Sequence, residues 1–393
     1  MAAVAMRAGK RPIGARARGL IDDYTRDLTA RDLQRVFTRD TPAMLSFFTQ
    51  GTQQAETTRK DLLRHPFRNA RLFFHSFAMR LTAARRMLYA GAVLLFVMGL
   101  FDGLSPDPGE PLWDTGAVKL LVAFGLIHLI LLLEVADRLT LKHELNVARD
   151  IQRAMLPAGT LTVGAIEAHG ETQPANTVGG DFYDILPRLD GQVLVILGDV
   201  AGKGTPAALL MALFLAMTRT LLDEALPPAA LALRLNEQLM RHSPRSRFIT
   251  AFIGLFDPRT SAVRYVNAGQ NPPMVRRASG QLEWLAPTGM ALGLSRKATY
   301  VEQTIVLAPG DLLMAYSDGI TEAESPAGVA FDEDGLRQLA GQMDGLPAGL
   351  VARRVIDQVK AHTDDSVLFD DLTVLVCRRL DPDAPPPLPT EAA

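Results

Sequence analysis

The chain has 393 residues, of which 48% are hydrophobic and 21% are charged. This composition excludes a disordered polypeptide and is enough for more than one domain. A single cysteine excludes a disulfide framework and a cysteine-based zinc site. The net charge of −2 averages two unlike parts, because residues 1–90 carry 17 Lys and Arg against 7 Asp and Glu, and the remainder carries 24 against 36. A basic N-terminal region therefore precedes an acidic body.

Residues 1–86 form this basic region, and apolar residues at helical spacing predict that it is mostly helical. Its cations would either bind anionic membrane lipid or form a solvated face. The first 20 residues are rich in arginine and contain no acids, which would also suit a mitochondrial transit peptide. The arginines are not interspersed with aromatic residues and do not belong to a recognised nucleic-acid-binding motif, so we expect no nucleic-acid binding.

Residues 87–136 are predicted to form a hairpin of two transmembrane helices. Residues 87–101 carry no charge, and residues 117–135 contain only Lys119, His128 and Glu134 as polar ionisable groups. A helix needs about 20 mostly apolar residues to cross a bilayer, so both segments are near the lower limit. The alternative is a helical hairpin buried inside a soluble domain.

The charges that flank the hairpin predict its orientation. Arg80, Arg85 and Arg86 precede the first segment, and Arg138 and Lys142 follow the second. The loop between the segments contains no Lys or Arg. Positive charge is retained on the cytoplasmic side of a membrane, so we expect both termini to be cytoplasmic.

Residues 137–157 continue the second segment as a helical linker. One stripe carries Leu139, Leu145, Ala148, Ile151 and Met155, and Pro157 ends the helix. A heptad-like stripe beside a membrane hairpin is typical of a coiled coil, so the linker predicts a homodimer seam or a packing face.

Residues 158–380 are predicted to form one α/β domain, followed by a disordered Pro-rich tail at 381–393. Alternating and continuous apolar runs predict strands, and Pro206 suits the first turn of a helix. The predicted strands are 181–186, 192–200, 248–256, 262–267, 274–277, 301–307, 312–317 and 373–377, and the predicted helices are 206–222, 229–241, 334–342 and 350–362.

Aspartates recur where the apolar strands of this domain begin or end. They are Asp181, Asp199, Asp318 and the pair Asp370-Asp371. Any one of them alone would be explained by the frequency of Asp and Gly in turns. Four such positions in one domain instead predict carboxylates that converge on one point, where divalent cations would neutralise their repulsion. Oxygen ligands without Cys or His favour Mg²⁺ or Mn²⁺ over zinc.

Five motifs, in this order, resemble bacterial metal-dependent serine/threonine phosphatases of the SpoIIE/RsbU type, a branch of the PP2C-like superfamily. The motifs are Val178-Gly179-Gly180-Asp181-Phe182-Tyr183-Asp184, Gly198-Asp199-Val200-Ala201-Gly202-Lys203-Gly204, Asn267-Ala268-Gly269-Gln270-Asn271-Pro272-Pro273, Tyr316-Ser317-Asp318-Gly319 and Asp370-Asp371-Leu372-Thr373. The resemblance covers residues 148–379, including the lead-in Ala148-Arg149-Asp150-Ile151-Gln152. It implies an α-β-β-α sandwich, with two antiparallel sheets flanked by helices.

The resemblance also implies a role for each aligned acid. Asp199 would bridge two metal ions, with the Val200 carbonyl as a backbone ligand. Asp318 and Asp370 would complete the shell of the first ion, and Asp181 would lie near the second. Asp199 and Asp181 are thus the expected catalytic centre. Two such ions activate a water for in-line attack on phosphorus.

The residues disfavour two alternatives: a phosphatase with a cysteine nucleophile and a protein with a nucleotide-binding P-loop. Cys377 ends an apolar strand and lacks a phosphate-cradling loop, so we expect a core residue rather than a nucleophile. Residues 202–204 lack the spacing of a phosphate-binding P-loop. The chain departs from family patterns at Ala201, where larger relatives have a histidine, and at Gln270. We therefore expect water, rather than a histidine, to protonate the leaving group.

The sequence thus predicts a membrane-tethered protein phosphatase that hydrolyses phosphoserine or phosphothreonine. The resemblance implies a bacterial inner-membrane location and a cytoplasmic phosphoprotein substrate, specifically a STAS-type anti-sigma factor antagonist. The alternative is a membrane scaffold whose phosphatase-like domain binds partners without turnover. Clustered carboxylates are costly to retain, which argues against that alternative.

Overall fold

The computed structural model describes residues 74–75, 77–104, 115–244, 247–364 and 368–380. The chain divides into two compact units, Met1–Arg138 and Leu139–Ala393, and helix α7 contributes residues to both. Most of the predicted basic region 1–86 and the whole of the predicted tail 381–393 lie outside the described residues.

The first unit contains an antiparallel pair of helices. Helix α6 spans Ala83–Leu104 and helix α7 spans Thr115–Met155. Asp102 near the end of α6 pairs with Lys119 near the start of α7 at 2.5 Å. Arg85 near the start of α6 contacts Glu134 at 3.2 Å and Asp137 at 2.8 Å. These ion pairs join opposite ends of the two helices, so the helices form a hairpin.

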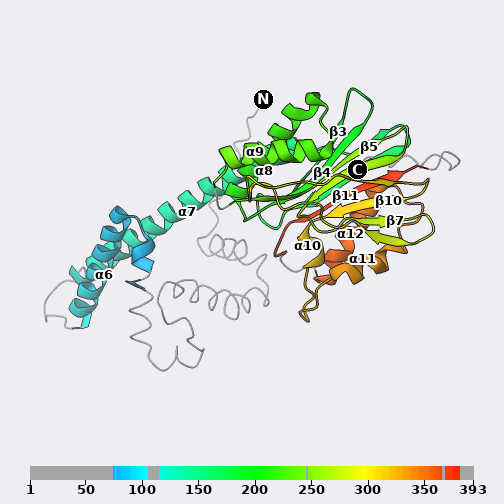
Figure 1. Cartoon of the computed structure of the whole chain (residues 1–393). Coiled ribbons are helices and arrows are strands. Elements are labelled where there is room, and N and C mark those ends of the chain that lie inside the picture. The colour runs from blue at the N-terminus through cyan, green and yellow to red at the C-terminus, as the bar shows by residue number, and fades with distance from the viewer. Residues whose placement is uncertain (1–73, 76, 105–114, 245–246, 365–367, 381–393) are drawn as a thin grey trace, which may run out of the picture. The chain divides into compact units, whose positions relative to one another are not determined.

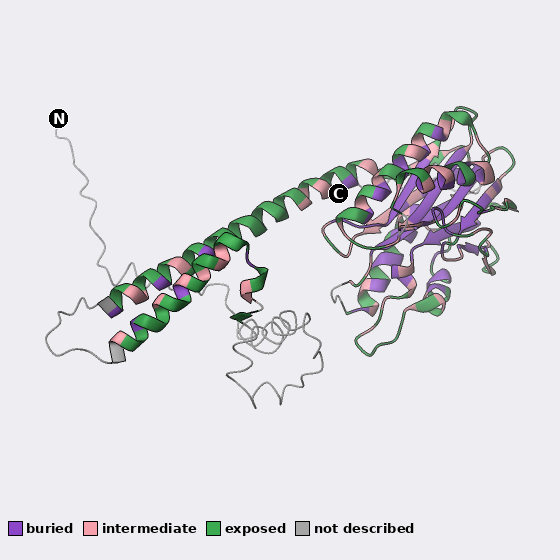
Figure 2. Ribbon diagram, turned by 60° about the vertical axis from the view of Figure 1, so that its left-hand side comes forward, coloured by how far each residue is buried: buried purple, intermediate pink, exposed green. Residues whose placement is uncertain are grey.

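The hairpin exposes apolar side chains, as Figure 2 shows by its predominantly exposed residues. Leu94 is 61% exposed, Leu121 68% and Leu132 66%. A continuous apolar surface of this kind is unusual on a soluble protein and suits a lipid environment. Among the described residues, three helical segments are long and apolar enough to cross a membrane: Ala83–Asp102, Gly116–Met155 and Thr205–Glu224.

The third of these segments contains helix α8 (Thr205–Leu221), which packs into the core of the second unit. Its inner face buries Met211, Phe214 and Leu215 completely. Burial against a sheet explains its apolar sequence, as expected for a core helix.

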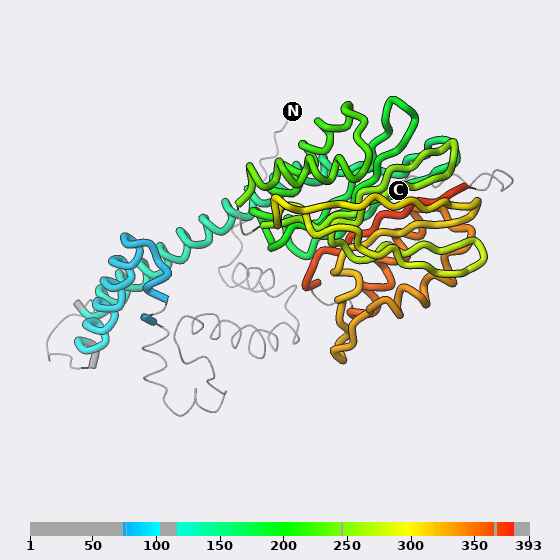
Figure 3. The backbone as a smooth tube through the Cα atoms, viewed as in Figure 1, coloured from blue at the N-terminus to red at the C-terminus, as the bar shows by residue number. Residues whose placement is uncertain are grey.

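The second unit is a sandwich of two antiparallel sheets (Figures 1 and 3). The five-stranded sheet has the order β3-β4-β5-β6-β9, and the six-stranded sheet has the order β1-β2-β11-β10-β7-β8. The strands are β1 (Thr160–Val163), β2 (Ile166–Gln173), β3 (Phe182–Pro187), β4 (Val193–Val200), β5 (Ile249–Asp257), β6 (Ala262–Ala268), β7 (Met274–Arg276), β8 (Leu282–Trp284), β9 (Gln303–Val306), β10 (Leu312–Tyr316) and β11 (Leu372–Arg379).

Helices cover the outer face of each sheet. The remaining helices are the short 3₁₀ helix η2 (Leu222–Glu224), α9 (Pro228–His242), α10 (Asp318–Thr321), α11 (Asp332–Ala340) and α12 (Ala348–His362). Helices α8 and α9 share a core with the five-stranded sheet, and α11 and α12 share another with the six-stranded sheet. A third core lies between the sheets. The predicted α-β-β-α sandwich is therefore confirmed.

Strand β4 shows why a strand with almost no polar residue forms here. Leu194 and Ile196 pack toward α8 and α9, while Val195 and Leu197 pack into the core between the sheets. Successive side chains of a strand point to opposite faces, so both faces of β4 must be apolar. The only cysteine, Cys377 in β11, is also fully buried, as expected of a core residue.

Candidate active site

The ends of four strands bring the predicted aspartates together. Asp181 immediately precedes β3, and Asp199 lies near the end of its antiparallel neighbour β4, where Phe182 pairs with Gly198. In the other sheet, Asp318 follows β10 and Asp370 precedes β11, where Tyr316 pairs with Val374. Each sheet therefore presents the two ends of an antiparallel strand pair. Asp199 and Asp370, one from each sheet, line the same pocket.

The closeness of these carboxylates raises their pKa values. Burial, followed by the charges of Asp199 and Asp371, raises the pKa of Asp181 well above its ordinary value. Burial and the charge of Asp318 are the main causes that raise the pKa of Asp199 to about 6, and a hydrogen bond with Asp181 opposes them. The pKa of Asp318 is raised by burial and by Asp370. Mutual repulsion thus opposes ionisation at this end of the sandwich.

The chemistry of these groups fits a hard cation. All the side-chain donors are carboxylate oxygens, and Asp181 Oδ2 is buried without a hydrogen-bond partner. Within the described ranges, no three His, Cys, Asp or Glu side chains are gathered closely enough to hold a metal ion as they stand. The acids therefore lie in one region without forming a finished coordination shell.

Asp371 organises the loop that carries Asp181. Its carboxylate accepts hydrogen bonds from the backbone N–H groups of Ala175 and Gly180, both at 2.8 Å, and from that of Asp181 at 3.4 Å. A Cβ atom on Gly179 would overlap this carboxylate, which explains the glycine there. The hydrogen-bonding capacity of Asp371 is consequently used by the loop that carries Asp181.

Lys203 is a contact of the site that the sequence did not reveal. Its Nζ lies 2.7 Å from Asp370 Oδ2 and donates to the Phe369 carbonyl at 2.6 Å. The glycines on either side, Gly202 and Gly204, have φ values of 107° and 74°, a region that favours glycine. The tight turn between β4 and α8 thereby places a cation on an acid of the opposite sheet.

Asp184 is buried like Asp181 but has a different environment. Its Oδ2 lies 2.8 Å from Nε of Arg219 on α8, and its Oδ1 accepts from the Ile185 N–H. This ion pair fixes β3 against α8. Asp184 is therefore engaged by Arg219 and not directed to the other acids.

Gln270, one of the departures from the family pattern, joins the two sheets beneath the acids. Its Oε1 accepts from the Thr250 hydroxyl of β5 at 2.7 Å, and its Nε2 donates to the Tyr316 carbonyl of β10 at 3.0 Å. The side chain is 4% exposed. Gln270 thus holds the strand ends of both sheets together through neutral hydrogen bonds.

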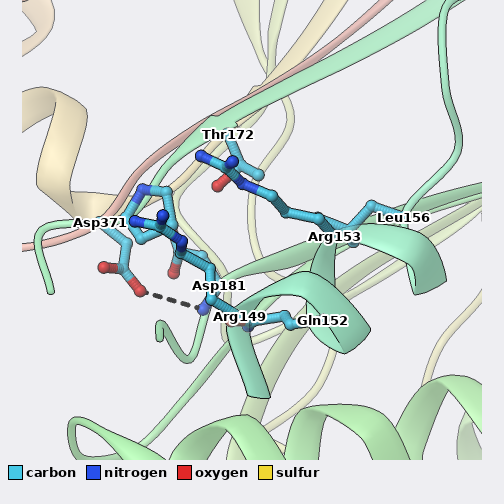
Figure 4. A pocket seen from close by; sticks show the side chains of 8 residues that line it. Arg149, Gln152, Arg153, Leu156, Thr172, Asp181 and Asp371 are labelled. Carbon is cyan, nitrogen blue, oxygen red and sulfur yellow. Dashed lines mark hydrogen bonds between the residues drawn. The ribbon is translucent and has the colours of Figure 1, made fainter. Parts of the chain in front are cut away.

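The last turns of α7 contact the same region through Gln152. Its Nε2 donates to the Gly179 carbonyl at 2.8 Å, and its Oε1 accepts from the Gly179 N–H at 3.2 Å. Figure 4 shows Gln152 beside Asp181 and Asp371, with Arg149 and Arg153 on the same helix. The last turns of α7, which lead into the domain, therefore form part of the wall of the site. Sequence periodicity alone could not show this contact.

Comparison with known proteins places this domain in a family. Residues 189–380 match the family model "Stage II sporulation protein E (SpoIIE)". The phosphoserine phosphatase RsbU of Bacillus subtilis is 26% identical over 240 residues, covering 61% of this chain and 71% of RsbU. Protein IcfG of Synechocystis is 28% identical over 268 residues, covering 60% of this chain but only 41% of IcfG.

The fold agrees with a solved structure. The SiaA-PP2C domain of Pseudomonas aeruginosa aligns with a TM-score of 0.55 at 23% identity, covering 63% of this chain and 99% of that domain. The sandwich, the position of its acids and the family match lead to one assignment. Residues 189–380 therefore match the SpoIIE family, in a chain that is similar to the phosphoserine phosphatase RsbU and has the fold of a PP2C domain.

Proposed function

We propose that this chain hydrolyses phosphoserine or phosphothreonine on a cytoplasmic regulatory protein in a metal-dependent reaction. The observation that carries the proposal is the meeting of acids from both sheets at one end of the sandwich, where Asp181 is buried, Asp199 is half-buried, and the charge of Asp199 raises the pKa of Asp181. A phosphatase that uses a cation to bind phosphate needs a cluster of this kind.

Asp181, Asp199, Asp318, Asp370 and the Val200 carbonyl are the proposed ligands of two Mg²⁺ or Mn²⁺ ions. When bound, such ions would supply an activated water and neutralise the charge of the phosphate. Asp199 is the proposed bridging ligand because the charges of both Asp318 and Asp370 act on it.

Other residues of the chain hold this ligand set in place. Asp371 fixes the loop before β3, and Gln270 fixes the ends of β5 and β10. Precise placement of ligands by surrounding hydrogen bonds is what a metal site requires.

The hairpin is proposed to tether the enzyme to the bacterial inner membrane through two passes, with both termini cytoplasmic. Its exposed apolar surface supports this proposal. A reporter fused after Leu104 should then be detected outside the cytoplasm, and a cytoplasmic signal would contradict the topology.

Two partner proposals follow from the family and the linker. RsbU is by name a phosphoserine phosphatase, and the resemblance supports a STAS-type anti-sigma factor antagonist as substrate. On α7, Leu139 and Ile151 are 62% and 60% exposed, which supports a homodimer through the linker helix. The basic region before the hairpin is proposed to bind anionic lipid.

The deciding experiment measures phosphate release from a phosphoserine peptide by the full chain in detergent micelles. We expect turnover with Mn²⁺, and background release with chelator or with Asp199→Asn. Asp334→Asn, whose side chain is 87% exposed on α11, is the matched control and should retain activity. Equal release in all samples would contradict the proposal and favour a non-catalytic scaffold.

A further inference from the structure

A small pocket lies between the last turns of α7 and the loop that carries Asp181 (Figure 4). Arg149, Gln152 and Arg153 line it from the helix, and Thr172, Asp181 and Asp371 line it from the sheet side. It adjoins the proposed metal site through Asp181, and Asp371 also lines the pocket that contains Asp199.

The two arginines have no partner within the described part of the chain. Arg149 Nε is buried without a hydrogen bond, and neither guanidinium is in ion-pair contact with Asp181 or Asp371. Most arginines of the domain are engaged; Arg219 pairs with Asp184 and Arg277 with Glu283, for example. A buried guanidinium N–H without an acceptor is unfavourable, so an acceptor that reached Arg149 Nε would stabilise this half-buried side chain, while Arg153 is exposed.

The position of the arginines is fixed by the protein. Gln152, between them in sequence, is 8% exposed and holds this turn of α7 to Gly179 through two hydrogen bonds. Figure 4 shows both arginine side chains extending from α7 across the pocket, with Arg153 directed toward Thr172. The turn of α7 that carries Arg149 and Arg153 is therefore held in place, while their guanidinium groups remain available to a ligand.

An anion is the ligand that this pocket can bind. A guanidinium presents five N–H donors in a planar fork, which matches the oxygens of phosphate in bidentate pairs. The neighbouring carboxylates would repel an anion unless a cation neutralised them, so anion binding here should depend on a bound metal ion.

We propose that Arg149 and Arg153 bind phosphoryl oxygens of the phosphoprotein substrate and of the phosphate product. This inference rests on the proposed function and adds two specificity-determining residues to it. The linker helix would then contribute to substrate recognition in addition to joining the domain to the hairpin.

The test uses the full chain in detergent micelles, saturated with Mn²⁺, and inorganic phosphate as the probe. The wild type should show a phosphate-induced increase in melting temperature and competitive inhibition of peptide hydrolysis by phosphate. Arg149→Ala should raise both the KM for a phosphoserine peptide and the inhibition constant of phosphate about tenfold, and the double alanine variant should abolish the melting shift.

Two controls separate recognition from folding. Arg234→Ala removes an exposed arginine on α9 whose nearest acid, Glu224, is 3.8 Å away, and it should behave as the wild type. Arg149→Lys keeps the charge but loses the bidentate fork, so an intermediate inhibition constant is expected. The melting shift caused by Mn²⁺ itself should be unchanged in every arginine variant.

Three outcomes would overturn the inference. They are no phosphate-induced shift in the Mn²⁺-loaded wild type, wild-type phosphate binding in the double variant, and loss of the Mn²⁺ shift together with the phosphate shift. The last would mean that the arginines support the acidic cluster. A wild type that binds phosphate through these arginines but releases none from the peptide would instead contradict the proposed function.

Discussion

The five-stranded and six-stranded sheets both supply acids to the site, but they hold them differently. In the five-stranded sheet, Asp181 is buried with one oxygen that has no hydrogen-bond partner, and Asp199 is half-buried. Asp370, from the six-stranded sheet, is 41% exposed and pairs with Lys203. If the proposed ions bind, the acids of the five-stranded sheet should therefore depend on them more, because Lys203 already partly neutralises Asp370.

The largest effects on kcat/KM are expected from single substitutions of one acid in each sheet. Asp199→Asn should lower kcat/KM on the order of 10³-fold, because the bridging position affects both proposed ions. Asp318→Asn should lower it on the order of 10²-fold, because one ion would be held normally. Steady-state hydrolysis of a phosphoserine peptide measures both, and equal losses would show that the two sheets contribute alike.

Removal of metal should destabilise the protein. At a Mn²⁺ concentration of 100 Kd, binding contributes about 2.7 kcal/mol, which corresponds to roughly 5–10 °C in Tm for a domain of this size. Thermal unfolding with Mn²⁺ and after chelation measures the difference. Asp199→Asn should show little dependence on Mn²⁺, and a full shift in that variant would place the cation elsewhere.

Substitution of two buried aspartates of the five-stranded sheet should change the free energy of unfolding in opposite directions. In metal-free protein at neutral pH, Asp181→Asn should increase stability by about 1–2 kcal/mol, because it removes the cost of burying an ionisable carboxyl beside Asp199 and Asp371. Asp184→Asn should decrease stability by about 2 kcal/mol, because Arg219 loses its partner. Denaturant unfolding after chelation measures both, and destabilisation by Asp181→Asn would contradict the electrostatic description of the site.

The smallest effect is expected at Lys203. The Nζ of Lys203 pairs with Asp370 but its side chain is 56% exposed, so the ion pair contributes about 1 kcal/mol or less. Lys203→Met should therefore strengthen Mn²⁺ binding at most about fivefold, because a competing cation is removed. Titration with Mn²⁺ followed by calorimetry measures it. Weaker Mn²⁺ binding would mean that Lys203 supports the ligands.

Strands with a clear apolar pattern could be predicted from the sequence, and β3 to β6 lie where expected. Strand β2 could not be predicted from the sequence, because it has no clear apolar pattern. Its polar residues Glu167, His169 and Glu171 alternate with the small residues Ala168 and Gly170. Glu167 accepts a hydrogen bond from the Ala348 N–H at the start of α12, so a polar residue is satisfied on a covered face. Strand β1 was missed with it, and β8 has only three residues.

The acids of the candidate site were predictable because each sits at a strand end. The contacts of Lys203 and Gln152 could not be predicted, because their partners lie far away in the chain. Lys203 bonds across 166 residues to the Phe369 carbonyl, and Gln152 across 27 to Gly179. Sequence spacing carries no information on such pairs until the two sheets are stacked.

The burial of Cys377 has a practical consequence. Because the thiol lies in the middle of β11, fully covered and with its pKa raised by burial, it is protected from alkylating reagents in the folded state. Cysteines introduced at exposed positions could therefore be labelled selectively in the otherwise native chain. Spectroscopic labels on α7 and near β11 could then test whether the linker helix moves when the proposed phosphoprotein substrate is added.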